Sequence, residues 1–364
     1  MKIAQIAPLT ESVPPRLYGG TERIVSYLTD ELVRLGHDVT LFASGDSVAS
    51  ANLVPCAAMA LRLDANVRDP IPYYMLMLDR VREAADEFDI LHFHIDQFHF
   101  PLFRPMAQRT VTTLHGRQDL HDLKPLYLGF NEMPLVSISN DQRKPVPSSS
   151  NFVATIYHGI PADLLKPDFN PRGGYLAFLG RISPEKRPDR AIQIARALGI
   201  PLKIAAKVDK VDEVYFCEQI APLLKQPGIE YIGEINDFGK SEFLGQTSAL
   251  LFPVDWPEPF GLVMIEAMAC GTPVLAFRRG SVPEIVEEGL TGIIVDSMEE
   301  AVRRLPQALA LDRRKVRRRF EERFSVTRMA KDYLAVYRAL RRQARSEEHA
   351  APPLRLQPVL EGMN

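Results

Sequence analysis

The chain has 364 residues, of which 46% are hydrophobic and 25% are charged, and its formal net charge at pH 7 is −2. Single hydrophobic cores stop growing at roughly 250–300 residues, so this length predicts two domains. The near-neutral charge excludes a global basic field and, with it, bulk binding of nucleic acid. No stretch approaches the roughly 18 apolar residues of a membrane-spanning helix, which leaves attachment to a membrane surface open.

Short apolar segments alternate with helical patterns from the amino terminus onward, and this alternation predicts parallel sheets with crossover helices. Residues 2–8 are predicted to form the first strand. The following helix places Ile24, Leu28, Leu32 and Leu35 on one face and ends at Gly36. Further strands in the first half are predicted at residues 38–44, 89–95, 109–116, 135–140 and 152–159.

A second alternating series follows residues 164–174, which contain two prolines and two glycines and are interpreted as the linker. Its strands are predicted at residues 175–181, 202–208, 229–235, 249–254, 273–277 and 292–296, with a helix at 187–199. We expect an α/β protein of two Rossmann-like doubly wound domains, residues 1–165 and 166–327, that face each other across a cleft. A charged helical stretch extends to residue 345, and residues 346–364 are predicted to form a flexible tail.

The cysteines and the amino terminus bear on localisation. Cys56, Cys217 and Cys270 form neither a CxxC pair nor a metal-binding spacing, which favours a reducing cytoplasm. The opening residues MKIAQIAPLT lack the long apolar region and cleavage site of a signal peptide. We therefore expect a cytoplasmic protein.

The stretch EPFGLVMIEAMACGTPVLA, residues 258–276, carries two carboxylates in an otherwise apolar segment. Gly261 precedes a predicted helix, whose first backbone N–H groups suit a phosphate. Glu266, about one turn into that helix, could accept hydrogen bonds from two vicinal ribose hydroxyls. Glu258 would face the cleft near a sugar attached to the phosphate. The alternative is that an acidic residue here only stabilises the helix dipole.

Two loops at predicted strand ends carry further candidates. In GRISPEKRPD, Arg181 and Lys186 lie at one sheet edge and could neutralise a diphosphate, although as isolated residues they would be a solvated charge pair. In RLYGGTER, Gly19 and Gly20 permit a backbone turn and close approach to a ligand, and a simple turn is the alternative. The spacing is not GxGxxG, so the dinucleotide fingerprint is absent.

Histidines at strand ends supply two more hypotheses. His115 would face the cleft, where its ring could donate a hydrogen bond to a sugar hydroxyl or its carbonyl could stabilise developing positive charge. An ordinary loop histidine is the alternative. His92, His94 and Asp96 alternate along one strand and could converge on a metal, but no clear fourth ligand is present and a core or cleft-rim role is favoured.

Residues 313–323 contain six arginines and one lysine against two glutamates. A solvated helix face is the favoured interpretation, and a basic surface for a membrane or a partner is the alternative. The chain has no GxxxxGK[ST] phosphate loop, no GxSxG elbow and no HExxH motif.

The motifs YGGTERIV, TLHG, SISN, IYHGIP, LGRISPEKRPD and EPFGLVMIEAMACGTPV occur in the order found in one enzyme family. The chain resembles the retaining glycosyltransferases of family 4, which have the GT-B architecture, over nearly its whole length to about residue 340. The resemblance implies transfer of a sugar from a UDP- or GDP-linked donor to an acceptor hydroxyl with retention of configuration. It also implies front-face attack without a metal, with the nucleoside-diphosphate sugar as co-substrate and no other cofactor.

The resemblance assigns roles to individual residues. The catalytic residues it implies are His115 near the reacting carbon, Glu258 at the donor sugar, and Arg181 and Lys186 at the diphosphate. The donor-binding residues it implies are Gly19, Gly20, Arg181, Lys186, Ile235 against the base, Glu258, Phe260, Gly261, Leu262 and Glu266 at the ribose. It also implies that the helix at 328–345 crosses back to the N-terminal domain. His158 stands where many relatives have asparagine, and we expect only a local change there.

The acceptor, a small molecule, a glycan or a lipid-linked sugar, is expected on the N-terminal domain near Tyr18, Phe98 and Phe100. These aromatic rings could stack on a sugar, although packing in the core explains them equally well. A sugar phosphorylase would need a cofactor-binding lysine and a longer chain. A nucleotide-sugar epimerase or hydrolase would release nucleoside diphosphate without an acceptor. A non-catalytic nucleotide-sugar binding protein would not need the residues of the predicted catalytic set.

Overall fold

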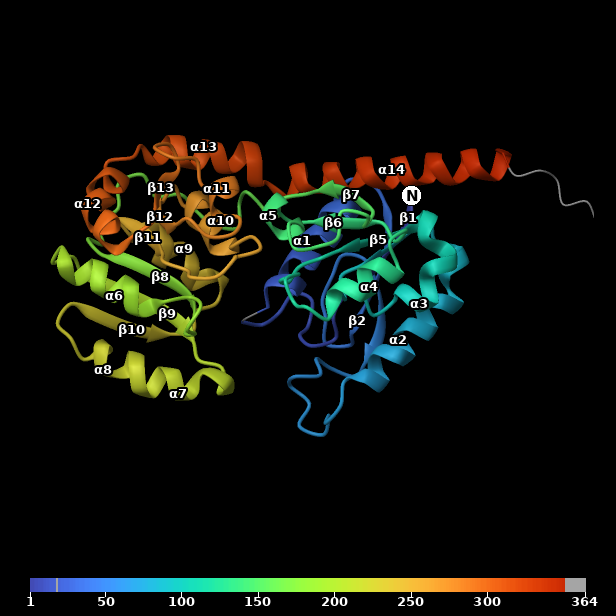
Figure 1. The fold of residues 1–364 in the computed structure, drawn as a ribbon, viewed down its shortest axis with the longest axis horizontal. Helices are drawn as coiled ribbons and strands as arrows, with labels where there is room; N and C mark the ends of the chain where they lie inside the picture. The colour runs from blue at the N-terminus through green and yellow to red at the C-terminus, as the bar shows by residue number, and fades with distance from the viewer. Residues whose placement is uncertain (18, 351–364) are drawn as a thin grey trace, which may run out of the picture.

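The structure, a computed structural model, describes residues 1–17 and 19–350 and contains two parallel sheets in separate α/β domains (Figure 1). The first sheet has seven strands in the order β3-β2-β1-β4-β5-β6-β7, and the second has six in the order β10-β9-β8-β11-β12-β13. Neighbouring strands run parallel in both sheets, as in the pairs β1–β4 and β8–β11. The expected pair of doubly wound domains is therefore confirmed.

The N-terminal sheet is built from short apolar strands that are covered by helices. Its strands are β1 (Lys2–Ile6), β2 (Asp38–Ser44), β3 (Asn52–Ala57), β4 (Ile90–Phe93), β5 (Thr110–Thr113), β6 (Leu135–Ser137) and β7 (Phe152–Thr155), and its helices include α1 (Gly20–Arg34), α2 (Ile71–Glu83), α3 (Phe100–Phe103), α4 (Leu123–Gly129) and α5 (Asn140–Arg143). The sequence did not predict β3, which contains Pro55. Because β3 is an edge strand, the sheet tolerates the missing N–H group of this proline.

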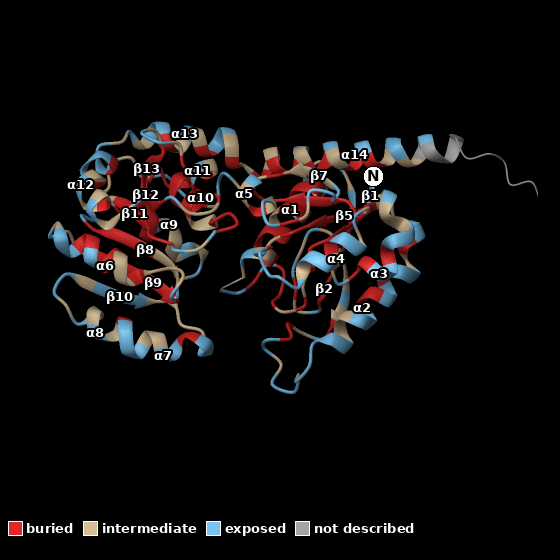
Figure 2. Ribbon diagram, viewed as in Figure 1, coloured by how far each residue is buried: buried red, intermediate tan, exposed pale blue. Residues whose placement is uncertain are grey.

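The C-terminal domain repeats this plan. Its strands are β8 (Leu176–Arg181), β9 (Leu202–Lys207), β10 (Ile229–Gly233), β11 (Ala249–Phe252), β12 (Val274–Phe277) and β13 (Gly292–Val295), and its helices include α6 (Pro188–Ala197), α7 (Glu213–Tyr215), α8 (Ala221–Leu224), α9 (Asp237–Gln246), α10 (Leu262–Ala269), α11 (Val282–Ile285), α12 (Met298–Leu309) and α13 (Arg313–Phe324). In both domains the central strands form the buried layer, and the edge strands β3, β7 and β10 are partly exposed (Figure 2).

The last helix, α14 (Val326–Ala350), leaves the C-terminal domain and lies along the N-terminal domain (Figure 1). Tyr333 and Tyr337 on this helix are fully buried and belong to the same core cluster as Ile24 and Leu28 of α1. The helix continues through residues 346–350, which the sequence assigned to the tail. The rest of the predicted tail, residues 351–364, lies outside the described residues.

The arginine-rich helix α13 does not present its cations to solvent as a group. Arg313 donates to the carbonyl oxygens of Asp168, Thr247 and Gly245, at 2.6, 2.9 and 2.8 Å. Arg317 donates to the carbonyl of Leu165, in the segment predicted as the linker, and to that of Ala162 just before it. The favoured solvated face is therefore wrong for these residues, whose guanidinium groups tie the linker to the C-terminal domain.

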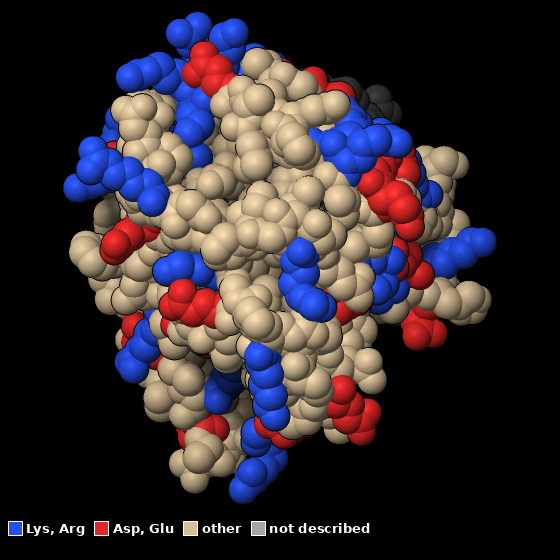
Figure 3. All heavy atoms as spheres, turned by 90° about the vertical axis from the view of Figure 1, so that its left-hand side faces the viewer, with Lys and Arg blue, Asp and Glu red and all other residues tan. Residues whose placement is uncertain are grey.

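The outer face of the C-terminal domain mixes basic and acidic side chains and shows no single basic field (Figure 3). Arg319 and Arg323 of α13, for example, both pair with Glu287. None of the helices within residues 1–17 and 19–350 combines the length and apolar character that a membrane crossing requires.

Candidate active site

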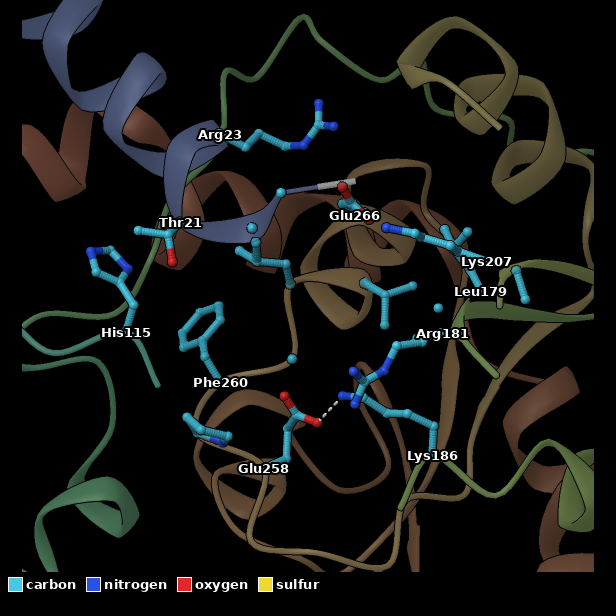
Figure 4. Close-up of a pocket in the computed structure, with 18 of the residues that line it drawn as sticks. Thr21, Arg23, His115, Leu179, Arg181, Lys186, Lys207, Glu258, Phe260 and Glu266 are labelled. Carbon is cyan, nitrogen blue, oxygen red and sulfur yellow. Dashed lines mark hydrogen bonds and ion pairs between the residues drawn. The ribbon is translucent and has the colours of Figure 1, made fainter. Parts of the chain in front are cut away.

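A cavity of about 480 Å³ is lined by residues of both domains. This volume lies within the range of small-molecule sites, roughly 300–1,000 Å³. Figure 4 shows Thr21 and His115 on one side of the cavity and Arg181 and Lys186 on the other. Every residue that the sequence nominated for catalysis or donor binding lines it: Gly19, Gly20, His115, Arg181, Lys186, Ile235, Glu258, Phe260, Gly261, Leu262 and Glu266.

The start of α10 lies at the centre of this lining. Gly261, its N-cap residue, has a φ of 78°, and no side chain caps the helix. This left-handed conformation favours glycine, and a Cβ atom here would lie 2.7 Å from Cε of Met264 and 3.0 Å from Cζ of Phe252, so both side chains would have to shift. In the first turn of α10 the Met264 N–H group donates to the Gly261 carbonyl at 3.0 Å. Because no side chain caps the helix, the N–H groups of Leu262 and Val263 are available to an anion in the cavity.

Glu266 is 5% exposed and contacts a lysine that the sequence did not nominate. Its Oε1 atom lies 2.7 Å from Nζ of Lys240 on α9. Oε2 has no hydrogen-bond partner among the described residues, and Glu266 lines the cavity. One oxygen of this buried carboxylate can therefore accept from a ligand while the other stays with the lysine.

Glu258 shows the same arrangement on the loop before α10. Its Oε2 atom contacts Nζ of Lys186 and accepts a hydrogen bond of 2.9 Å from Nε1 of Trp256 (Figure 4 shows the lysine contact). The ammonium group of Lys186 also lies 5.1 Å from the centre of the Trp256 ring. These contacts hold the carboxylate at the rim of the cavity.

The backbone of Glu258 rests directly on Gly280. A Cβ atom at Gly280 would lie 2.3 Å from N and 2.4 Å from O of Glu258, closer than real Cβ contacts allow. The next residue, Ser281, donates its N–H to the Glu258 carbonyl at 2.9 Å. Gly280 therefore allows the two loops to approach closely enough to place Glu258.

Arg181, the last residue of β8, lies among three carboxylates. Its guanidinium contacts Glu185 and lies 3.5 Å from Asp209 and 3.5 Å from Asp212. Burial works to raise the pKa of Asp209, but contacts with Lys207 and Arg181 outweigh it and lower the pKa. A diphosphate at Arg181 would therefore exchange with carboxylate contacts that already orient the guanidinium.

His115 follows β5 and reaches the cavity from the N-terminal domain. Its Nε2 atom lies 2.9 Å from Nδ1 of His94, and burial lowers the pKa of His115 to about 3, so the ring is neutral. The ring stacks on His158 at a centroid distance of 5.3 Å and an angle of 18°. His158 itself lines the cavity, so its effect extends beyond the local turn that the sequence suggested.

The alternative metal site at His92, His94 and Asp96 is not supported. The ring nitrogens of His92 contact Tyr337 and Thr113, and those of His94 contact Gln5 and His115. Within residues 1–17 and 19–350, no three His, Cys, Asp or Glu side chains form a group that could hold a metal ion.

Of the two interpretations left open for the aromatic residues, the structure places Phe100 in the core and leaves Phe98 exposed at the surface. Phe100 is fully buried in a core cluster with Tyr127 and Leu135, and Phe98 stacks on Tyr74 at 5.4 Å. Neither phenylalanine lines the cavity. The third aromatic residue, Tyr18, lies outside the described residues.

On the N-terminal side, the cavity is lined instead by charged residues that the sequence did not nominate. Arg62 pairs with Glu11 at 2.7 Å, and Glu22 is 6% exposed. Burial raises the pKa of Glu22, with nearby Glu11 adding to the rise. Arg23 of α1 forms an ion pair with Asp237 of α9 and so bridges the two domains. Their positions at the carboxyl end of β1 and at the start of α1 are the sequence signal that could have identified Glu11, Glu22 and Arg23.

Two family profiles match consecutive parts of the chain. The profile of Glycosyltransferase Family 4 matches residues 18–144, and that of Glycosyl transferases group 1 matches residues 163–324. The protein belongs to the family 4 glycosyltransferases with GT-B fold. Among relatives of this glycosyltransferase, the phosphatidyl-myo-inositol mannosyltransferase of Propionibacterium freudenreichii is 26% identical over 80% of this chain and 81% of the relative.

Two other similar proteins cover more of the glycosyltransferase chain. The Spore coat protein SA of Bacillus subtilis is 23% identical over 93% of this chain and 99% of the relative. The crystal structure of Anabaena HepE in complex with UDP and glucose superposes with a TM-score of 0.71 at 17% identity, covering 93% of this chain and 100% of that one. The similarity to HepE shows a shared fold.

Proposed function

We propose that this glycosyltransferase moves a sugar from a nucleoside-diphosphate sugar to an acceptor hydroxyl with retention of the anomeric configuration. One observation carries the proposal. Glu258 precedes the uncapped start of α10 and Glu266 follows it, and both line one cavity. Lys186 holds one oxygen of Glu258, and Lys240 holds one oxygen of Glu266. The cavity therefore offers carboxylates for hydroxyl groups and N–H groups for a phosphate side by side.

In this proposal Glu266 accepts hydrogen bonds from the ribose hydroxyls through Oε2, while Lys240 stays at Oε1. Ile235, which lines the same cavity, packs against the base. Glu258 accepts from a hydroxyl of the transferred sugar. The complex of HepE with UDP and glucose is consistent with this ligand class. The choice between uracil and guanine is left to experiment.

The diphosphate lies between the start of α10 and the side chains of Arg181 and Lys186. As the bond to the sugar breaks, negative charge develops on the leaving group, and these preorganised donors stabilise it. The start of α1 faces the same cavity and also lacks a side-chain cap. We assign the neutralisation of the leaving group to these protein groups without a metal ion.

In this proposal the anomeric configuration is retained because the acceptor hydroxyl attacks the same face of the sugar from which the diphosphate leaves. Glu258 contacts Lys186, which we assign to the diphosphate, so its carboxylate lies on the side of the leaving group. A nucleophile for double displacement must attack from the opposite side. We therefore propose a front-face route in which a donor phosphate oxygen takes the proton of the acceptor hydroxyl.

The proposal is tested with purified full-length protein, a panel of UDP- and GDP-linked sugars, and acceptors that include inositol derivatives. The expected result is release of nucleoside diphosphate that depends on the acceptor, with a product whose anomeric proton coupling matches the donor. Release without an acceptor would instead identify a hydrolase, and a changed sugar without release an epimerase. Binding without any turnover would identify a binding protein.

Arg181→Ala provides the residue-level test. Loss of one preorganised donor costs about 10²–10³-fold in kcat. The matched control is Arg278→Ala, which removes an exposed arginine paired with Asp296 in the same domain and is expected to transfer sugar normally. Equal activity of both variants would contradict the assignment of Arg181 to the leaving group.

A further inference from the structure

A chain of buried hydrogen bonds connects α14 to His115. Nε2 of Gln5 donates to the Tyr337 hydroxyl at 3.3 Å, and Oε1 of Gln5 lies 2.7 Å from Nε2 of His94. Nδ1 of His94 then lies 2.9 Å from Nε2 of His115. Gln5 and Tyr337 are fully buried and His94 is 3% exposed, so water does not compete for these contacts.

The order of donors and acceptors along this chain determines the state of His115. A neutral imidazole has one N–H group and one nitrogen lone pair. Because Oε1 of Gln5 can only accept, Nε2 of His94 carries the proton and Nδ1 of His94 accepts. Nε2 of His115 must then donate to it, which leaves the lone pair of His115 on Nδ1.

The contacts of Tyr337 agree with this direction. Its hydroxyl accepts from Gln5 and lies 2.7 Å from Nδ1 of His92, to which it can donate. Nε2 of His92 then donates to Oγ1 of Thr113 at 2.7 Å. In the structure the amide nitrogen of Gln5 faces Tyr337 and its oxygen faces His94, and this orientation sets the direction of the chain. Turning that amide over would reverse each bond and put a proton on Nδ1 of His115.

The surroundings of His115 favour the neutral ring. Burial lowers the pKa of His94 and His92 well below the usual value, and the neighbouring histidines lower it further. Burial also lowers the pKa of His158, which stacks on His115, and His115 and Arg328 lower it further. Arg328 donates to the carbonyl of His158.

We infer that Gln5, His94 and Tyr337 are positioning residues that hold the lone pair of His115 Nδ1 toward the cavity. At this point the site accepts a hydrogen bond from a hydroxyl of the transferred sugar. The inference rests on the proposed function and makes it more specific. A donor sugar with a hydroxyl group next to Nδ1 of His115 can donate a hydrogen bond to it. A uronic acid with a carboxylate at the same place has no proton to donate, and its oxygen lone pairs face the nitrogen lone pair. The enzyme is therefore expected to prefer the sugar with the hydroxyl group.

The tautomer is measured by NMR on full-length protein with ¹⁵N-labelled histidine rings, with His115→Gln used to assign the signals. At pH 7 the expected spectrum shows His115 protonated at Nε2 and unprotonated at Nδ1. A proton on Nδ1, or a fully protonated ring, would overturn the inference.

Two variants separate positioning from simple loss of a buried hydroxyl. Tyr337→Phe removes the group that orients Gln5, and a second His115 tautomer is expected to appear. Tyr175→Phe is the matched control, because Tyr175 is also buried but its hydroxyl donates to the Phe243 carbonyl at 2.8 Å, outside this chain of hydrogen bonds. It is expected to leave the His115 signals unchanged. Identical spectra for the two variants would rule out the role of Tyr337.

Kinetics with paired donors supply the functional measurement. Tyr337→Phe is expected to lower kcat/KM for a hydroxyl-bearing sugar at least about tenfold and to reduce the preference over the matching uronic acid. Tyr175→Phe is expected to keep the preference. Absence of any transfer by the wild type would reject the proposed function while the NMR result still decides the tautomer. Transfer with an unchanged preference in Tyr337→Phe would overturn this inference alone.

Discussion

The ammonium group of Lys240 lies 2.7 Å from Oε1 of Glu266 and 3.4 Å from Oδ1 of Asp237. Asp237 also pairs with Arg23 of α1. Charged side chains thus run without interruption from α10 of the C-terminal domain to α1 of the N-terminal domain. The carboxylate that we assign to the ribose is therefore connected to an ion pair that bridges the two domains.

Replacing Glu266 with glutamine is expected to weaken binding of the nucleoside diphosphate about 10- to 100-fold. Hydrogen bonds to a charged group contribute about 1.5–3 kcal/mol, and each 1.4 kcal/mol corresponds to a factor of ten in affinity. Titration calorimetry with UDP and GDP measures the change. Glu242→Gln, at an exposed position on α9, is the control for loss of one negative charge. Equal affinities for the two variants would argue against ribose binding at Glu266.

Replacing Gly280 with alanine is expected to displace the Glu258 loop and to raise the KM for the donor. The new Cβ atom would lie 2.3 Å from the backbone nitrogen of Glu258, so the loops must separate. Gly289→Ala provides the control, because Gly289 also has a positive φ, 74°, but no atom lies within 4 Å of its added Cβ. Both variants lose about 1–2 kcal/mol from the left-handed backbone. Donor kinetics and thermal unfolding should show the larger loss at Gly280, and equal effects would contradict the packing argument.

Replacing Arg313 with alanine is expected to lower the free energy of unfolding by about 2–4 kcal/mol, because several buried carbonyl groups lose their donor. The guanidinium also donates to Oγ1 of Thr272 at 2.7 Å. Arg318→Ala is the control, because Arg318 is exposed on the same helix and both variants exchange arginine for alanine in a helix. It is expected to change the free energy of unfolding little. Urea unfolding of the two variants measures the difference. A small effect at Arg313 would show that water replaces its hydrogen bonds.

Stability is expected to fall as the pH drops below about 6.5, the ordinary pKa of histidine. Burial is the largest cause that lowers the pKa of six histidines in the folded state: His37, His92, His94, His99, His115 and His158. Between the folded and unfolded pKa values the unfolded chain binds more protons, so the stabilisation is complete above the unfolded pKa and is lost at lower pH. Each such histidine contributes a slope of about 1.4 kcal/mol per pH unit.

His99 allows this pH dependence to be tested away from the cavity. It is fully buried and its Nε2 atom contacts Oγ1 of Thr112 at 2.9 Å. His99→Gln is expected to reduce the dependence of the unfolding free energy on pH between pH 6 and 5 by about 1.4 kcal/mol per pH unit, the contribution of one histidine. His121→Gln, at an exposed position, is the control and should keep the wild-type slope. Urea unfolding across this pH range measures the two slopes, and equal slopes for the two variants would contradict the assignment to His99.

The strands were predictable because each is a short apolar run between turn residues, and the structure confirms the predicted strand positions while shortening most of them. β3 was missed because Pro55 and the half-exposed pattern of an edge strand weaken the signal. Phe100 could not be placed from sequence, since an aromatic ring before a turn is equally compatible with a cavity and with a core. In the structure, packing with Tyr127 decides for the core.

The strand-end rule and the family motifs together nominated residues that all line the cavity. Lys240 and Gly280 were missed because their importance comes from what they touch. Lys240 reaches Glu266 from a helix 26 positions earlier, and Gly280 matters through its distance to the Glu258 backbone. Local sequence contains neither relationship. The same holds for Gln5, whose side chain meets Tyr337 only after the chain has folded back.

The return of α14 has a consequence for the order of assembly. Tyr333 and Tyr337 complete a core that begins with Ile3 of β1, so residues from the two ends of the chain close one domain. During synthesis the entire C-terminal domain leaves the ribosome before those tyrosines do. The N-terminal domain is therefore begun first and completed last.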